Sequence, residues 1–220
     1  MKTIIVLCMS VLAILPAPAR AAEPDIARDV ARLEQAYESL SDMQAVFSQQ
    51  SSSGAVPVVQ RASGRVYFKK KGKMLWQYET PEEQHIILDG TTLWVYLPDE
   101  KQAMKNNFAT IPQHIVVDLF RGKMEILKKF KAAYALRAPD DTADQVVLEL
   151  EPLEPDPMIA SLVVRLDPRS YLVEQSSLTD ALGNRTVLTF QDIRVDQGLS
   201  DSLFEFTPPR GVDVFEPPQL

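Results

Sequence analysis

Four short segments of this chain, all between residues 61 and 97, are connected by turns of only a few residues. The segments are residues 61–70, 73–79, 84–88 and 92–97, and the turns carry Gly72, Thr80 with Pro81, and Asp89 with Gly90. Alternation of side chains in short runs bounded by such turn residues is typical of β-strands. Connections this short join antiparallel neighbours. The middle of the chain therefore predicts an antiparallel sheet.

The segments on either side extend this sheet and add two helices. Apolar residues recur at spacings of three and four in residues 25–40, which predicts an amphipathic helix, and a strand follows directly with Met43, Ala45 and Phe47 on one face. A second, shorter helix is predicted over residues 111–120. Further strands are predicted over residues 146–151, 162–167, 171–179, 185–195 and 204–207. The pattern predicts a mainly β (α+β) fold of ten or eleven strands.

The N-terminal end reads as a secretory signal peptide. Lys2 precedes an apolar run over residues 4–15, and Ala19, Arg20 and Ala21 form a small-residue cleavage site. The run is too short for the roughly 20 residues of a membrane-spanning helix. We expect residues 1–21 to be removed and residues 22–220 to form a single soluble, exported domain, which retains no cysteine because Cys8 is lost.

The net charge of this domain limits the classes of partner that it can bind. The whole chain has a formal net charge of −7, and loss of Lys2 and Arg20 changes it to −9. An acidic protein without a basic stripe lacks the charge that supplies most non-specific affinity for nucleic acid, so we expect no DNA or RNA partner. We expect a monomer.

The central strands are rich in aromatic residues. Met74, Trp76 and Tyr78 share one face of their strand. In the following hairpin, one face carries His85, Ile87, Trp94 and Tyr96, and the other carries Ile86, Leu88, Leu93 and Val95. Because both faces of the hairpin are apolar, both need shelter by helices, by the curl of the sheet or by a bound molecule. Such residues suit the wall of a cavity, and equally the core of an ordinary sandwich or barrel.

The order and spacing of these residues resemble a known family, the LolA-type periplasmic carriers of outer-membrane lipoproteins. The resemblance lies in residues 64–70 (GRVYFKK), 72–78 (GKMLWQY), Pro81, 89–90 (DG), 92–96 (TLWVY), Pro98 and Gln102, and more loosely in residues 45–49 (AVFSQ) and 204–211 (FEFTPPRG). It implies an incompletely closed antiparallel β-barrel whose helices lid an apolar cavity for acyl chains. It also implies a chaperone that receives lipoproteins from an inner-membrane ABC-type release complex and delivers them to an outer-membrane receptor.

The resemblance also implies roles for individual residues. The cavity wall would comprise Phe47, Met74, Trp76, Tyr78, Trp94 and Tyr96, and the lid helix would contribute Leu33, Tyr37 and Leu40. Trp94→Glu is therefore expected to abolish cargo loading. Many family members carry an arginine latch where this chain has Lys70 and Lys71, and a lysine, which lacks the planar fork, would make Lys70 a looser latch at the rim.

Other functions find less support in the residues. His85 and His114 are the only histidines and have no ligand partners near them in the sequence, so we expect no metal, no cofactor and no catalysis by an esterase-like triad. The nucleotide-binding and nucleophile-elbow motifs are absent. Lys69, Lys70, Lys71 and Lys73 form a basic group, either a solvated strand end or a contact for anionic headgroups. The alternative function is a periplasmic binding or sensor module for another lipid or lipid-linked ligand.

Overall fold

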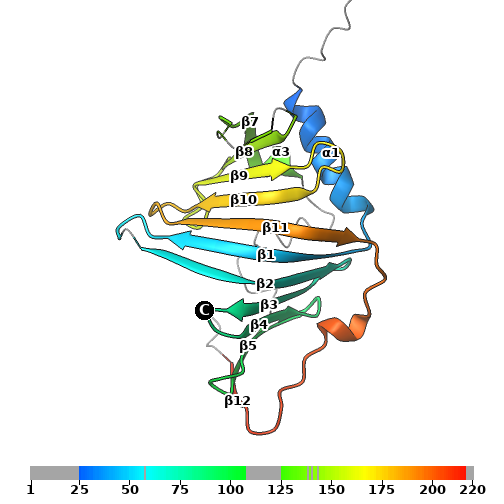
Figure 1. Ribbon diagram of the computed structural model, residues 1–220, viewed down its shortest axis with the longest axis vertical. Helices are drawn as coiled ribbons and strands as arrows, with labels where there is room; N and C mark the ends of the chain where they lie inside the picture. The colour runs from blue at the N-terminus through cyan, green and yellow to red at the C-terminus, as the bar shows by residue number, and fades with distance from the viewer. Residues whose placement is uncertain are drawn as a thin grey trace, which may run out of the picture.

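The computed structural model of the protein describes residues 25–56, 58–107, 125–137, 139, 141–142 and 144–216. These residues form one twelve-stranded sheet in the order β12-β6-β5-β4-β3-β2-β1-β11-β10-β9-β8-β7 (Figure 1). The strands are β1 (Asp42–Ser52), β2 (Val59–Lys69), β3 (Lys73–Thr80), β4 (Gln84–Leu88), β5 (Thr92–Leu97), β6 (Gln102–Asn107), β7 (Phe130–Tyr134), β8 (Val146–Pro152), β9 (Ser161–Leu166), β10 (Val173–Thr179), β11 (Arg185–Val195) and β12 (Asp213–Phe215).

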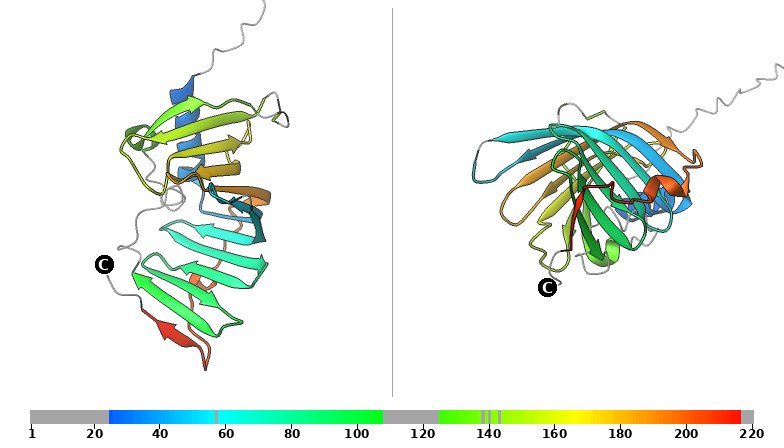
Figure 2. Two further views of the ribbon diagram at one scale, coloured as in Figure 1. Left: turned by 90° about the vertical axis from the view of Figure 1, so that its left-hand side faces the viewer. Right: turned by 90° about the horizontal axis from the view of Figure 1, so that it is seen from below.

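Neighbouring strands are antiparallel, with one exception at the edge of the sheet. β12 runs parallel to β6, with Val214 opposite Ala103. β7 forms the opposite edge, and the two edges do not pair, so the sheet curves without closing (Figure 2). The prediction of an incompletely closed antiparallel sheet is confirmed, and the described residues form twelve strands in place of the predicted ten or eleven.

Helix α1 (Ile26–Ser39) lies across the half of the sheet that contains β7 to β10 (Figure 1). It begins where the Asp25 side chain accepts a hydrogen bond from the Arg28 amide, at 3.1 Å. Its buried stripe follows the helical repeat, with Val30, Leu33 and Tyr37 facing the sheet. A four-residue helix, α3 (Ile126–Lys129), lies beside α1 and leads into β7.

The two faces of the sheet carry separate apolar clusters. We call the face that contacts α1 the inner face and the opposite one the outer face. The inner cluster is the larger and joins α1 to side chains of β1, β2, β3 and β8 to β10. The outer cluster is centred on Leu75, Ile87 and Phe204, and Phe204 belongs to the C-terminal arm, residues 196–216, which contains the 3₁₀ helix η2 (Asp201–Phe204).

Some predicted elements differ from the structure. Residues 204–207, predicted as a strand, are the end of η2 and irregular backbone, because Phe204 turns its ring into the outer cluster instead of pairing with a strand. β6 and β12 were not predicted, since neither shows a clear alternation. The predicted signal peptide, the helix over residues 111–120 and His114 lie outside the described residues.

Candidate functional site

Aromatic side chains from three strands meet on the inner face. Phe47 of β1 contacts the edges of Trp76 and Tyr78 of β3, with ring centroids 4.8 and 4.9 Å apart. Two more rings surround Trp76, since Phe68 lies 5.9 Å and Phe190 6.2 Å from it. Edge-to-face packing at these distances is favourable. Phe47, Met74, Trp76 and Tyr78, which the sequence assigned to one wall, thus lie in a single cluster.

Phe68 and Phe190 were not among the predicted wall residues. Phe190 is 143 positions beyond Phe47 in the chain and reaches it because β1 pairs with β11, which places the two residues opposite each other. Alternation within each strand could have placed Phe190 on one face or the other. The contact itself follows from strand order, which no local pattern in the sequence specifies.

Gly64 provides the space in which these rings meet. It lies opposite Phe47 on β1 and Tyr78 on β3, next to a register shift between β2 and β3. A Cβ atom on Gly64 would come within 1.9 Å of the Gln77 carbonyl oxygen. The two strands can therefore approach this closely only with glycine at the position.

Burial on the inner face decreases along the strands. On β1, Met43, Ala45 and Phe47 are buried, whereas the next two inner positions, Gln49 and Ser51, are partly exposed. The same change occurs on β3, from buried Trp76 to half-buried Tyr78. The apolar inner face is therefore closed where β1 begins and more open where β1 ends.

Tyr78 lies at the transition between these two parts. Its hydroxyl donates a hydrogen bond to Gln49 Oε1, at 3.0 Å, and burial raises the pKa of the phenol. The ring faces the cluster while the hydroxyl is held at the polar end of the strand. This is the arrangement expected where an apolar surface meets water.

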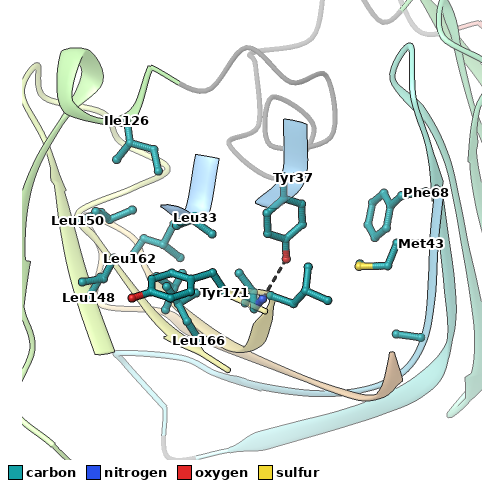
Figure 3. Close-up of a cluster of buried hydrophobic side chains, with 14 of the residues drawn as sticks. Leu33, Tyr37, Met43, Phe68, Ile126, Leu148, Leu150, Leu162, Leu166 and Tyr171 are labelled. Atoms are coloured by element: carbon teal, nitrogen blue, oxygen red, sulfur yellow. Dashed lines mark hydrogen bonds between the residues drawn. The ribbon is translucent and has the colours of Figure 1, made fainter. Parts of the chain in front are cut away.

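Helix α1 supplies a wall on the other half of the inner face (Figure 3). Leu33 and Tyr37 are buried against the sheet, and Leu40 is partly buried on the same cluster. The Tyr37 hydroxyl accepts a hydrogen bond from the Val173 amide of β10, at 3.0 Å, and burial raises the pKa of Tyr37. The three predicted helix residues therefore all face the sheet, and their movement as a lid stays a prediction.

A buried carboxylate holds the first turn of α1. Asp29 accepts hydrogen bonds from the hydroxyls of Tyr134, at 2.6 Å, and Tyr171, at 2.8 Å. Burial raises the pKa of Asp29, but the hydrogen bonds from Tyr134, Tyr171 and Arg28 outweigh it and lower the pKa overall. Burial and the bond to Asp29 raise the pKa of Tyr134 to about 12. Since β7 and the β9–β10 turn provide the tyrosines, α1 is tied to two parts of the sheet.

Trp94 and Tyr96 do not lie with Trp76. β4 pairs with β3 so that Ile87 is opposite Leu75, and with β5 so that Ile87 is opposite Trp94. Opposite residues share a face, which places Trp94 and Tyr96 on the outer face. There they pack against Phe206 of the C-terminal arm, with ring centroids 5.3 and 5.1 Å apart. Their predicted place on the same wall as Trp76 is wrong.

The hairpin is nevertheless apolar on both faces, as the alternation predicted. Ile86, Leu88 and Leu93 belong to the inner cluster. Ile87, Trp94 and Tyr96 belong to the outer cluster. The shelter of the outer side is the chain's own C-terminal arm, which the sequence did not reveal.

Polar contacts anchor this arm at the end where β1 begins. The buried Asp42 carboxylate accepts hydrogen bonds from three successive amides, those of Gln197, Gly198 and Leu199, at 2.8 to 3.1 Å. Lys69 and Lys73 both form ion pairs with Asp201 of the arm. Half of the predicted basic group is therefore engaged with the protein itself. The Lys70 side chain is exposed just beyond β2, and its role as a latch stays a prediction.

The described residues offer little for other chemistry. Among them, no three or more His, Cys, Asp and Glu side chains come together as a metal site. His85 lies on the outer face beside Glu83, at 3.1 Å, and Tyr96. No helix in this part of the chain is both long and apolar enough to cross a membrane.

Comparison with known proteins relates most of the chain to one family. A family model described as "Outer membrane lipoprotein carrier protein LolA" matches residues 38–207. The outer-membrane lipoprotein carrier protein of Azotobacter vinelandii is 29% identical over 217 residues, which cover 98% of this chain and 100% of the relative. That of Coxiella burnetii strain RSA 331 is 30% identical over 183 residues, covering 83% and 84% of the two chains.

A solved structure also has a similar fold. An uncharacterized conserved protein from Thermus thermophilus aligns with a TM-score of 0.55 over 87% of this chain and 98% of its own. The identity is 12%, so this likeness concerns the fold alone.

Proposed function

The chain belongs to the LolA family of outer membrane lipoprotein carrier proteins, and we propose that its inner face holds the acyl chains of a lipoprotein during transport across the periplasm. The observation that carries the proposal is the inner aromatic cluster, whose apolar surface becomes progressively exposed toward the end of β1. On the outer face, the apolar cluster is already packed against the C-terminal arm. The inner face is therefore the one on which a ligand can pack.

The physical task is to keep acyl chains away from water. Exposing one chain of about a dozen CH₂ groups costs on the order of 10 kcal/mol, and a mature lipoprotein bears up to three such chains. An apolar surface that covers them makes transfer through water possible. Binding must still be weak enough for the cargo to leave, so a face with partly exposed rings suits a carrier better than a sealed core does.

We propose the remaining assignments on the basis of the family resemblance. The protein acts in the periplasm after removal of the signal peptide, as a single domain and a monomer. It takes lipoproteins from an inner-membrane ABC-type release complex and passes them to an outer-membrane receptor. It catalyses no reaction and needs no cofactor.

The proposal is tested by adding the purified chain from residue 22 to spheroplasts and following newly made lipoproteins. We expect them in the soluble fraction as a one-to-one complex with the carrier. Leu188 on the inner face and Val187 on the outer face are adjacent and both half-buried, so Leu188→Glu and Val187→Glu form a matched pair. Leu188→Glu should prevent release, and Val187→Glu should permit it. Absence of release by the unaltered chain, while a known carrier works in parallel, would contradict the proposal.

A further inference from the structure

Exposed apolar side chains gather at the end of the sheet where β1 ends. They belong to three loops, residues 53–56 with 58, 153–160 and 180–184, which lie on the left in Figure 1. The most exposed is Leu182, at 82%, and Met158 and Leu153 are exposed at 55% and 57%. Val56 and Val58 belong to the same group. We call these three loops the apolar rim.

The loops of the apolar rim are fixed to one another. The Gly54 amide donates to Asn184 Oδ1, at 3.2 Å, and a Cβ on Gly54 would lie 2.6 Å from the Leu182 carbonyl oxygen. The Ala181 amide donates to the Pro157 carbonyl, at 3.3 Å. Leu182 and Met158 are therefore carried on neighbouring, mutually bonded loops.

A pocket opens within the apolar rim. It has a volume of about 460 Å³ and is lined mainly by Pro152, Pro155, Pro157 and Ile159. Ile159 is buried and also belongs to the inner cluster. The Ile159 side chain is thus shared by the pocket and the inner cluster, which places the pocket beside the inner face.

The charge of the apolar rim restricts what can bind there. Its three loops contain Glu154, Asp156 and Asp180 but no lysine or arginine. Hydrogen bonds from Asn184 lower the pKa of Asp180, which keeps this carboxylate charged. Negative charge disfavours an anionic lipid surface and favours a peptide in which apolar residues are flanked by basic ones.

At the opposite end of the strands, the described residues carry fewer exposed apolar side chains, Tyr134 and Leu136 at the end of β7. There Asp42, Lys69 and Lys73 are engaged with the C-terminal arm. An acylated protein whose lipid lies on the inner face can lead its polypeptide out past either end of the strands. Both the exposure of the inner face and the free apolar surface point to the end with the rim.

We propose that the apolar rim binds the polypeptide segment that follows the acylated end of the cargo, with an apolar side chain in the proline-lined pocket. This inference rests on the proposed function, because it assumes that the acyl chains lie on the inner face. It adds a second contact, which recognises the protein part of the cargo. Carriage would then favour cargo whose first residues combine apolar and basic side chains.

The test compares two probes that bear the same acyl chains. One is an N-terminally acylated dipeptide, and the other continues into a twelve-residue peptide of apolar residues and lysines. Displacement of a fluorescent fatty acid from the full mature chain gives both affinities. We expect the longer probe to bind on the order of tenfold more tightly. A Leu182→Ser, Met158→Ser double variant, which removes the apolar contacts without adding charge, should lose this preference and still bind the dipeptide.

A Leu136→Ser, Met104→Ser variant makes the same change outside the apolar rim, at residues exposed at 97% and 40%, and should keep the preference. Equal binding of the two probes by the unaltered chain would overturn the inference, as would a preference that survives in the rim variant. Loss of dipeptide binding in the rim variant would assign the rim to the acyl chains and overturn it too. Failure of the unaltered chain to bind either probe would overturn the proposed function, and the inference with it.

Discussion

Two aromatic clusters lie back to back in this sheet, and they differ in what covers them. The inner cluster around Trp76 contains rings of several strands and becomes exposed toward Tyr78. The outer cluster around Trp94 and Tyr96 is covered by Phe206 of the same chain. Aromatic content therefore does not identify a ligand surface in this fold. The two faces are distinguished by whether a segment of the chain covers them, and the segment that covers Trp94 and Tyr96 lies over 100 residues away in the sequence.

The inner face should be the more sensitive to added volume. Gly64→Ala would place a methyl group 1.9 Å from the Gln77 carbonyl oxygen, so β2 and β3 would have to separate beneath Phe47 and Tyr78. We expect the free energy of unfolding to fall by roughly 3 kcal/mol. Urea denaturation measures this change. Ser63→Ala, one residue earlier, is the control, and equal stability of the two variants would show that the strands have room.

The outer face should depend on the anchor of the arm. Asp42→Ala leaves the amides of Gln197, Gly198 and Leu199 without their acceptor, and we expect a loss of about 2–3 kcal/mol. Hydrogen exchange at these amides should accelerate, whereas binding of an acylated peptide should be retained. Asp196→Ala removes the acceptor of a single exposed hydrogen bond, which the Ser41 amide donates, and should have a smaller effect. Unchanged exchange in Asp42→Ala would mean that something else holds the arm.

The attachment of α1 to the inner face should depend on pH. The pKa of Asp29 in the folded protein lies below its ordinary value of 3.8, so its contribution to stability is present above that value and is lost as the pH falls through the folded pKa. Asn in place of Asp29 removes this contribution. The Asp29→Asn variant should be less stable than the unaltered chain at pH 7, and thermal unfolding should show the difference shrinking below pH 3.8. A difference that is constant with pH would exclude Asp29 as its origin.

The smallest effect is expected at the basic group. Lys70 is exposed, so Lys70→Ala should change the rate of cargo release by less than about threefold. Lys69→Ala should act more strongly, through the arm, because Lys69 donates to the Leu199 carbonyl, at 2.6 Å, and pairs with Asp201. Stopped-flow release of a fluorescent fatty acid compares the two. A large acceleration in Lys70→Ala would instead support the role of Lys70 as a latch.

The sequence predicted individual strands better than it predicted their relations. The bounds of β4, β5 and β11 agree with the predicted segments, and alternation placed Ile87 and Trp94 on one face of their hairpin. Alternation could not place that hairpin relative to Trp76, because the register of β3 with β4 depends on the turn between them. A shift by one residue exchanges the two faces. Trp94 was therefore assigned to the wrong side.

The arm was hidden for a different reason. Its apolar residues Leu199, Leu203 and Phe204 follow no strand or helix repeat, because each one fills a gap in the outer cluster individually. Side chains whose positions depend on contacts with a distant part of the chain show no periodic pattern in the local sequence. The family resemblance correctly implied the curved sheet. The assignment of individual residues to the cavity wall was wrong for Trp94 and Tyr96, the two that the arm covers.

The comparison of the two faces is tested most directly by Tyr78→Glu and Tyr96→Glu. Both tyrosines are partly exposed strand residues, one on the inner face and one on the outer face. The measurement is the dissociation constant of an N-terminally acylated peptide, with circular dichroism to verify folding. We expect Tyr78→Glu to weaken binding by at least about tenfold, because the new charge meets the acyl chains, and Tyr96→Glu to change it by less than about twofold. Normal binding by folded Tyr78→Glu, with loss of binding in folded Tyr96→Glu, would contradict this assignment of the faces.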